Sequence, residues 1–429
     1  MTLRQRLALF AYSWAMRLLL PAMLARYWWR GRKEPGYRVA MAERLGLVAR
    51  EAPGALWLHA VSLGETRAAA ALVDALRERL PGVRFLFTHG TATGRDAGRA
   101  LMKPGDTQCW LPLDTPGAVR RFLRRKRPAL GVLMETEVWP NLQQAALRLG
   151  VPMVLANARL SEKSARRGQR FAALMRPAAA AMADVLAQSE DDAERLREAG
   201  AAEVALCGNL KFDVHPSPAL VERGRGWHEA IGRPVVLAAI TREGEEEELL
   251  REWGRVNGRN PFLIVVPRHP QRFDEVAALL AQNGVRAVRR SQWKDTPPPE
   301  ALQADAWLGD SLGEMPLYYG CADVALLGGS FKPLGGHNLI EAAACGCPIV
   351  MGPSTYNFAQ AASQAVRAGA GWQEQGAAPA VRRALQVAQD EHLRSIASTR
   401  ALAFAAGHRG AAARMADRIA ARFEAGRTA

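Results

Sequence analysis

The chain has 429 residues, of which 49% are hydrophobic, and a formal net charge of +15 at pH 7. This length exceeds one ordinary core and this apolar content excludes a disordered chain, so we expect two domains. The excess of arginine and lysine indicates an anionic partner, and composition alone leaves nucleic acid, a membrane surface and a phosphorylated substrate open. The five cysteines are odd in number, which argues against a disulfide framework, and they include no Cys-x-x-Cys pair of the usual zinc spacing.

The N-terminal segment, residues 1–30, is predicted to form an apolar helix that associates with a membrane. The stretch from Leu7 to Trp29 is mostly apolar but is interrupted by Arg17 and Pro21. A charge near the middle of a span costs about 2.5–3.5 kcal/mol, so a helix lying in the membrane surface fits better than a crossing one. Basic residues that follow would meet anionic lipid head groups on the cytoplasmic side. A buried helix of a soluble domain is the alternative.

Two series of strand and helix signals follow, over residues 31–212 and 221–429, separated by a linker at 213–220. The short apolar runs predicted as strands are 55–60, 83–88, 130–134, 151–156, 185–187 and 204–207, then 235–239, 262–266, 285–288, 306–308, 324–327 and 349–351. Buried strands alternating with helices form parallel sheets. We therefore predict an α/β protein with two doubly wound, Rossmann-like domains that face a cleft.

Polar motifs follow several of these strands, where ligands of doubly wound sheets bind. The first motif, HAVSLGE, ends in Glu65, which would serve as a general base on an acceptor hydroxyl if its pKa were raised. The same residues form a capping box, Ser62-x-x-Glu65, and taken alone the motif favours a helix cap.

Two further motifs belong to the same half of the chain. METEVWPN (134–141) contains Glu135, which would orient an acceptor or support Glu65; a solvated strand end is the alternative. GNLKFD (208–213) contains Lys211, which would neutralise a leaving phosphate; a lone surface lysine is the alternative.

The second half carries three motifs suited to an anion. In PRHP (267–270), Arg268 and His269 would bind phosphate oxygens, or the two prolines only shape a turn. GEM (313–315) opens a helix whose N–H groups would hold a phosphate or a base. In residues 328–353 a glycine-rich loop leads into a helix starting near Asn338, and this arrangement suits a nucleotide phosphate better than an ordinary turn.

Seven motifs, taken in order, resemble those of the 3-deoxy-D-manno-octulosonic acid (Kdo) transferases of Gram-negative bacteria. They are HAVSLGE, METEVWPN, ANARLS, GNLKFD, PRHP, GEM and GGHNLIEAAACGCPIVMGP. The resemblance implies a GT-B glycosyltransferase of the cell inner membrane, at its cytoplasmic face. It also implies CMP-Kdo as donor and a lipid A precursor (lipid IVA) as acceptor, in lipopolysaccharide core biosynthesis. The sequence shows no cluster of metal ligands, and we expect no cofactor.

The resemblance also implies roles for single residues. Glu65 matches the catalytic base, and Glu135 and Lys211 match positions that stabilise the transition state. The positions that match a CMP-binding site are Arg268, His269, Gly313, Glu314, Met315, Asn338, Leu339, Ile340 and Glu341. Glu65 would take the acceptor's hydroxyl proton while the oxygen attacks Kdo, and CMP would leave with inversion of configuration.

Three other functions are weighed against this one. Another GT-B transferase or an epimerase that uses a UDP-sugar would share the glycine-rich loop. A basic membrane scaffold would leave the polar motifs at the strand ends unexplained. Nucleic-acid binding is not expected, because the basic run RRFLRRKR (120–127) has few aromatic residues and lies on a predicted helix.

Overall fold

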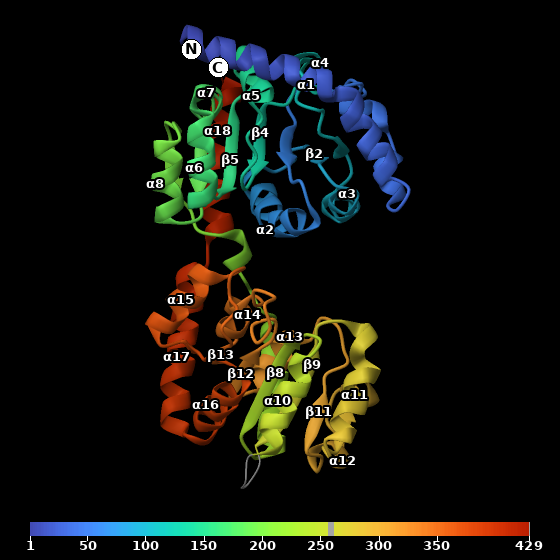
Figure 1. Cartoon of the computed structure of the whole chain (residues 1–429), viewed down its shortest axis with the longest axis vertical. Helices are drawn as coiled ribbons and strands as arrows, with labels where there is room; N and C mark the ends of the chain where they lie inside the picture. Colours follow the sequence, from blue (N-terminus) through green and yellow to red (C-terminus); the bar gives the residue numbers. More distant parts are fainter. Residues whose placement is uncertain (256–260, 429) are drawn as a thin grey trace. The chain divides into compact units, whose positions relative to one another are not determined.

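The structure, a computed structural model, describes residues 1–255 and 261–428. The chain divides into two compact units, Met1–Asp213 with Gly410–Ala429, and Val214–Arg409. Each unit is built on one seven-stranded sheet in which all paired strands run parallel (Figure 1). The prediction of two doubly wound α/β domains is therefore confirmed.

The first sheet has the order β3-β2-β1-β4-β5-β6-β7. Its strands are β1 (Leu56–His59), β2 (Phe85–His89), β3 (Thr107–Trp110), β4 (Leu130–Met134), β5 (Met153–Ala158), β6 (Asp184–Ala187) and β7 (Val204–Leu206). Leu58 lies in register with Phe87 of β2 on one side and Val132 of β4 on the other. Because the chain adds strands outward in both directions from β1, the gap between β1 and β4 is the topological switch point, where such sheets bind ligands.

Helices cover both faces of this sheet. They are α2 (Leu63–Arg79), α3 (Ala92–Gly98), α4 (Pro116–Lys126), α5 (Pro140–Arg148), α6 (Glu162–Arg170), α7 (Ala172–Ala180), α8 (Glu190–Glu198) and α18 (Ala411–Thr428). Side chains alternate along a strand, so Leu56 and Leu58 pack with α2 and α18, whereas Trp57 packs with α4.

The last helix, α18, belongs to the first unit, whereas the sequence pattern assigned all of 221–429 to the second domain. Met415, Ile419 and Phe423 of α18 are buried in the core beneath the first sheet. The Asp213 carboxylate accepts hydrogen bonds from the backbone of Gly410 (2.9 Å) and Ala412 (2.7 Å), which fixes the start of the helix. Periodicity identified a helix here but contained no information about which core it covers.

The second sheet has the order β10-β11-β9-β8-β12-β13-β14. Its strands are β8 (Val235–Thr241), β9 (Phe262–Pro267), β10 (Ala287–Arg289), β11 (Ala306–Leu308), β12 (Val324–Leu327), β13 (Ile349–Met351) and β14 (Gly371–Gln373). Its helices are α9 (Pro218–Ile231), α10 (Glu245–Gly254), α11 (Phe273–Gln282), α12 (Pro299–Leu302), α13 (Met315–Cys321), α14 (Leu339–Ala344), α15 (Ala359–Ala368), α16 (Ala377–Gln389) and α17 (Glu391–His408). The switch point lies between β8 and β12. Because α9 begins at Pro218, the first of the two connections between the units is shorter than the linker expected at 213–220.

The strand prediction missed β3 and β14. Both are short strands at a sheet edge, β3 in the first sheet and β14 in the second. An edge strand pairs with a neighbouring strand on one side alone, so it needs no continuous apolar run. The segments TQCW and GWQ lack the apolar run by which the buried strands were predicted.

The N-terminal helix α1 (Leu3–Arg30) lies along the first unit beside α5 and α7 (Figure 1). The Tyr12 hydroxyl donates to Asp114 Oδ2 at 2.9 Å, and the Ser13 hydroxyl donates to Asn141 Oδ1 at 2.7 Å. The opposite face leaves Phe10, Trp14 and Leu18 largely exposed. The helix is long and apolar enough to cross a membrane, yet one side of it is docked on protein.

Candidate functional site

Three glutamates gather at the carboxyl ends of β1 and β4. Glu65 lies in the first turn of α2, directly after β1, and Glu135 and Glu137 follow β4. Burial raises the pKa of Glu65, and the charge of Glu135 raises it further. Burial and then the charge of Glu65 raise the pKa of Glu137 to about 7. The three carboxyl groups therefore share one electrostatic environment at the switch point of the first sheet.

Glu65 lies in the first turn of a helix capped by Ser62 and presents its carboxylate at this switch point. The Ser62 hydroxyl accepts a bond from the Glu65 N–H at 3.4 Å and donates to Glu65 Oε1 at 3.1 Å. The other oxygen, Oε2, accepts from the Val61 N–H at 2.7 Å. Ser62 therefore caps the helix as expected, but the Glu65 carboxylate bonds the N–H of Val61 and not that of Ser62, so the reciprocal bond of a capping box is not formed. These bonds orient a carboxylate that burial has made more basic.

Lys211 is brought to the same place by η4 (Leu210–Phe212), the short turn after β7. Its Nζ lies 2.8 Å from Glu135 Oε1. Glu135 itself adopts the left-handed backbone region, with φ of 59°, which is unfavourable for a residue with a Cβ. The structure therefore brings together all three residues predicted for catalysis, Glu65, Glu135 and Lys211.

Groups of the opposite charge lie beside the second switch point, at the carboxyl ends of β8 and β9. Arg268 and His269 follow β9, and Arg242 follows the neighbouring strand β8. Burial lowers the pKa of His337 to about 4, with further lowering by the charges of Arg268, Arg242 and His269, so these four groups lie near one another. Within the described part of the chain, neither Arg242 nor Arg268 forms an ion pair through its guanidinium group. Both arginines are thus offered to an external anion.

An irregular turn in β8 places Arg242. Ile240 has φ of 55°, a true outlier for a β-branched residue, and the register with β9 shifts between Ala239 and Thr241. Gly328 lies against this turn, since a Cβ at that position would be 2.4 Å from the Ile240 carbonyl oxygen. The Thr241 carbonyl accepts the Arg268 N–H at 2.9 Å, which ties the two arginine-bearing turns together.

The glycine-rich loop is held from within the protein. The buried Glu245 carboxylate accepts the N–H groups of Gly329 (2.7 Å), Phe331 (2.9 Å) and Arg242 (2.9 Å). We expected the backbone N–H groups of the loop to approach a phosphate. In this structure two of them, those of Gly329 and Phe331, donate to Glu245 instead. The loop instead positions His337, whose ring would lie 3.0 Å from a Cβ at Gly329.

The segment Asn338–Glu341 borders the same cations. The Asn338 side chain accepts the Ile340 N–H at 3.1 Å and donates to Glu341 Oε1 at 3.2 Å. Burial raises the pKa of Glu341, while the nearby charge of Arg268 acts to lower it. Leu339 and Ile340 are buried in the core, so only their backbone atoms are placed to meet a ligand.

The GEM motif lies at the same edge of the sheet, after β11, which pairs with β9. Gly313 is exposed with φ of 80°, Met315 begins α13, and Glu314 pairs with Arg290 at 2.9 Å. Among the described residues, no hydrogen bond or ion pair joins this motif to Arg242 or Arg268. The three residues share the predicted edge of the sheet with the arginines.

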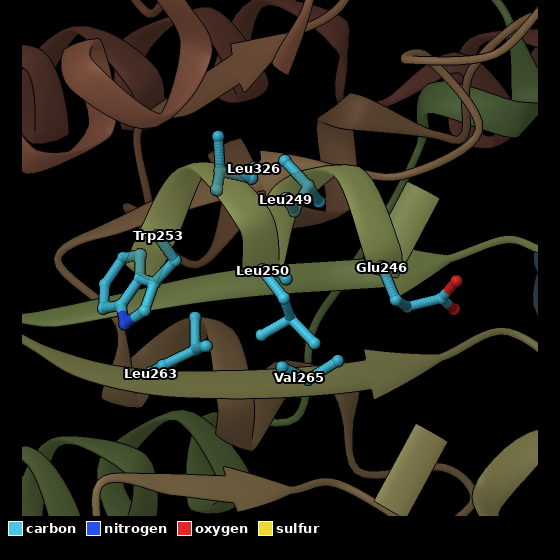
Figure 2. A pocket seen from close by; sticks show the side chains of 8 residues that line it. Glu246, Leu249, Leu250, Trp253, Leu263, Val265 and Leu326 are labelled. Carbon is cyan, nitrogen blue, oxygen red and sulfur yellow. The ribbon is translucent and has the colours of Figure 1, made fainter. Parts of the chain in front are cut away.

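A cavity with room for about one water molecule lies under α10 (Figure 2). Its apolar lining includes Leu249, Leu250 and Trp253 of α10, and Leu263 and Val265 of β9. At its rim Glu246 accepts from the Thr241 hydroxyl and from Arg272, each at 2.7 Å. We interpret the cavity as a packing gap and not as a ligand site.

Among the described residues, no group of three or more His, Cys, Asp and Glu side chains is arranged to hold a metal ion. Sequence reasoning missed Arg242 and Glu245. Arg242 lies three residues after the strand predicted at 235–239, much as Arg268 lies two residues after the one predicted at 262–266, and that shared placement was the available signal. Glu245 looked like one more residue of an acidic helix, and only the tertiary structure shows its carboxylate beneath the loop.

Comparison with known proteins gives consistent matches. Residues 40–214 match the family model described as 3-deoxy-D-manno-octulosonic-acid transferase (kdotransferase). The chain is 44% identical to a 3-deoxy-D-manno-octulosonic acid transferase of Bordetella pertussis, over 95% of this chain and 98% of that protein. It is 34% identical to the protein of the same name in Haemophilus influenzae, over 81% and 83%.

A solved structure extends the likeness to the whole fold. The crystal structure of a glycosyltransferase from Rickettsia africae matches with a TM-score of 0.56 at 12% identity, over 87% of this chain and 99% of that one. At this identity the likeness concerns the fold alone, which is the two-domain GT-B architecture.

Proposed function

This chain belongs to the 3-deoxy-D-manno-octulosonic acid (Kdo) transferase family, and from that premise we propose that it moves Kdo from CMP-Kdo to a lipid A precursor. The observation that carries the proposed chemistry is the Glu65 carboxylate, held by two hydrogen bonds at the switch point of the first sheet. The reaction is an inverting glycosyl transfer, with one acceptor hydroxyl replacing CMP at the anomeric carbon.

Glu65 removes the proton from the attacking hydroxyl. Its raised pKa makes it a better proton acceptor than an exposed glutamate, and the bonds from Val61 and Ser62 fix its orientation. Lys211, paired with Glu135, supplies a positive charge close to the base. This charge stabilises the negative charge that develops as the transfer proceeds.

The second unit binds the donor through its cations. CMP-Kdo carries a phosphate and a carboxylate, and Arg242, Arg268 and His269 offer positive or hydrogen-bonding groups at one sheet edge. The segment Asn338–Glu341 borders these groups and contacts the nucleotide, together with Gly313, Glu314 and Met315. Positive side chains take the part that a metal ion plays in other nucleotide-sugar enzymes.

We propose further that the N-terminal helix holds the enzyme at the cytoplasmic face of the cell inner membrane. Its exposed face carries Phe10, Trp14 and Leu18, which enter the lipid, while its docked face stays on the first unit. Arg32 and Lys33, just beyond the helix, meet anionic head groups. The acceptor is itself a lipid, so this position brings the enzyme to its substrate.

The test is to incubate the purified chain with CMP-Kdo and the lipid A precursor, and to measure the lipid by mass spectrometry. The proposal expects a mass increase by one or more Kdo units, with CMP released in equal amount. CMP should also raise the melting temperature of the free protein, whereas UDP should not. Stabilisation by UDP alone, with no Kdo on the lipid, would contradict the proposed donor.

A further inference from the structure

His59, at the end of β1, has a fixed tautomer. Its ring is fully buried, and Nδ1 lies 3.0 Å from the carbonyl oxygen of Thr88 and 2.9 Å from the Thr88 hydroxyl. A carbonyl oxygen only accepts hydrogen bonds, so Nδ1 carries the ring proton and Nε2 carries a lone pair. Burial lowers the pKa of His59 to about 3, with His89 adding to the effect, so the ring is neutral.

The lone pair of His59 faces Glu137. His59 Nε2 is buried without a hydrogen-bond partner among the described residues, and Glu137 Oε2 lies 3.9 Å from it. The same oxygen accepts from Trp139 Nε1 at 2.6 Å. An ionised Glu137 would direct negative charge at the lone pair, whereas a protonated Glu137 would donate to it after a shift of about 1 Å. The geometry matches a neutral Glu137.

The charged groups around Glu137 also indicate that this side chain is neutral. The charged groups that act on it are Glu65 and Glu135, and Lys211 is the cation that faces them. Lys211 pairs with Glu135. The neighbouring carboxyl groups of Glu65 and Glu137 therefore favour a state in which one of the two is ionised and the other is protonated. Glu65 accepts two hydrogen bonds and Glu137 accepts one, so ionisation favours Glu65.

We propose that Glu137 holds a proton at neutral pH and thereby keeps Glu65 ionised as the base. Glu137 is a positioning residue that acts through Glu65, and this inference rests on the proposed function of Glu65. Below neutral pH the pair carries one negative charge, on Glu65. As Glu137 ionises above neutral pH, a second negative charge appears beside the base and opposes the negative charge that develops there as the transfer proceeds.

An infrared titration of the full chain tests the proton directly and needs no substrate. The wild-type minus Glu137→Gln difference spectrum should show the carbonyl band of a protonated carboxyl group at pH 6, and the band should disappear as pH rises through about 7. Glu78→Gln, an exposed glutamate of α2, is the matched control, and in its difference spectrum the Glu137 band should cancel. Absence of the band in wild type would overturn the proposal, whatever the role of Glu65.

Two kinetic measurements extend the test. Glu137→Gln imitates the protonated side chain, so at pH 6.5 its kcat/KM should stay within about threefold of wild type, against a loss of about 10²–10⁴-fold for an essential ionised group. Above pH 7 the wild-type value of kcat/KM should fall and that of the variant should stay constant.

If Glu137→Gln does not fold, Trp139→Phe serves instead. Loss of the hydrogen bond from Trp139 should move the disappearance of the infrared band to higher pH. A hundredfold loss in Glu137→Gln, or an unmoved band in Trp139→Phe, would contradict the proposal.

Discussion

The two switch points of this chain have a similar topology and carry side chains of opposite charge at the strand ends nearby. In each sheet the first strand of the unit lies in the interior, between its second strand and a later one. After β1 and β4 the chain places Glu65, Glu135 and Glu137, and after β8 and β9 it places Arg242 and Arg268. The fold determines where functional side chains lie. The few residues after each strand determine whether that edge of the sheet carries a general base or binds an anion.

Both switch points also carry an unfavourable backbone conformation in a residue with a Cβ. Glu135 follows β4 and Ile240 lies in the irregular turn of β8, each with φ between 50° and 60°. Each conformation costs on the order of 1–3 kcal/mol, so the surrounding structure must hold it in place. The held turn aims Glu135 at Lys211 in one unit and carries Arg242 beside Arg268 in the other.

The largest expected effect tests the acidic side of this comparison. Glu65→Gln should lower the rate of transfer by about 10²–10⁴-fold, because a general base is lost while the side-chain shape is kept. Rates are measured by release of CMP at saturating donor and acceptor. Glu78→Gln, an exposed residue of the same helix, is the matched control and should retain the wild-type rate. Near-normal turnover in a folded Glu65→Gln protein would remove Glu65 from the mechanism.

A smaller effect concerns the core beneath the acidic switch point. Ile419→Ala in α18 should lower the free energy of unfolding of the first unit by about 2–5 kcal/mol, because Ile419 is fully buried there. Denaturant unfolding, with a fluorescent probe in each unit, measures the effect. Ile396→Ala, on the partly exposed surface of α17, should change stability by no more than about 0.5 kcal/mol. Selective loss of the second unit would contradict the placement of α18.

The basic side of the comparison predicts a loss of donor affinity. Arg268→Ala and Arg242→Ala should each weaken CMP binding by about 1.5–3 kcal/mol, the contribution of a hydrogen bond to a charged group. Calorimetric titration with CMP gives the change. Arg251→Ala, which removes an exposed arginine of α10, should leave CMP affinity unchanged. Unaltered affinity in Arg242→Ala would exclude that residue from the donor site.

The smallest effect lies outside both switch points, on α1. Trp14→Glu should lower binding to vesicles that contain anionic lipid by about tenfold, because an exposed apolar side chain no longer enters the bilayer. Co-sedimentation with vesicles measures the bound fraction. Leu402→Glu, an exposed apolar position on α17, is the control. Equal loss in both variants would argue against α1 as the membrane contact.

The sequence was informative where one local pattern has one structural meaning. Strands such as β4 and β9 are buried on both faces, so each was visible as a continuous apolar run, and polar residues after such runs marked the sheet edge. The edge strands β3 and β14 lack that burial and were missed. Which core α18 covers depends on Asp213 and on packing between distant segments, which periodicity does not encode.

The candidate sites were predictable to a similar degree. Glu65 and Arg268 each belong to a short motif after a strand, which the sequence displays. The role of Glu245 depends on three backbone donors, two of them from a loop more than eighty residues away, and the tautomer of His59 depends on Thr88 in a neighbouring strand. Such long-range hydrogen bonds follow from the fold and have no local sequence signal.

The most direct test of the whole account is a steady-state comparison of Glu65→Gln with Arg268→Ala, each assayed for CMP affinity and for turnover at saturating donor. If the first unit supplies the base and the second binds the donor, Glu65→Gln will bind CMP normally and turn over at least a hundredfold more slowly. Arg268→Ala will bind CMP weakly and lose far less turnover once the donor saturates. If Glu65→Gln instead lost CMP affinity, or Arg268→Ala kept it, the proposed division of labour between the two units would be contradicted.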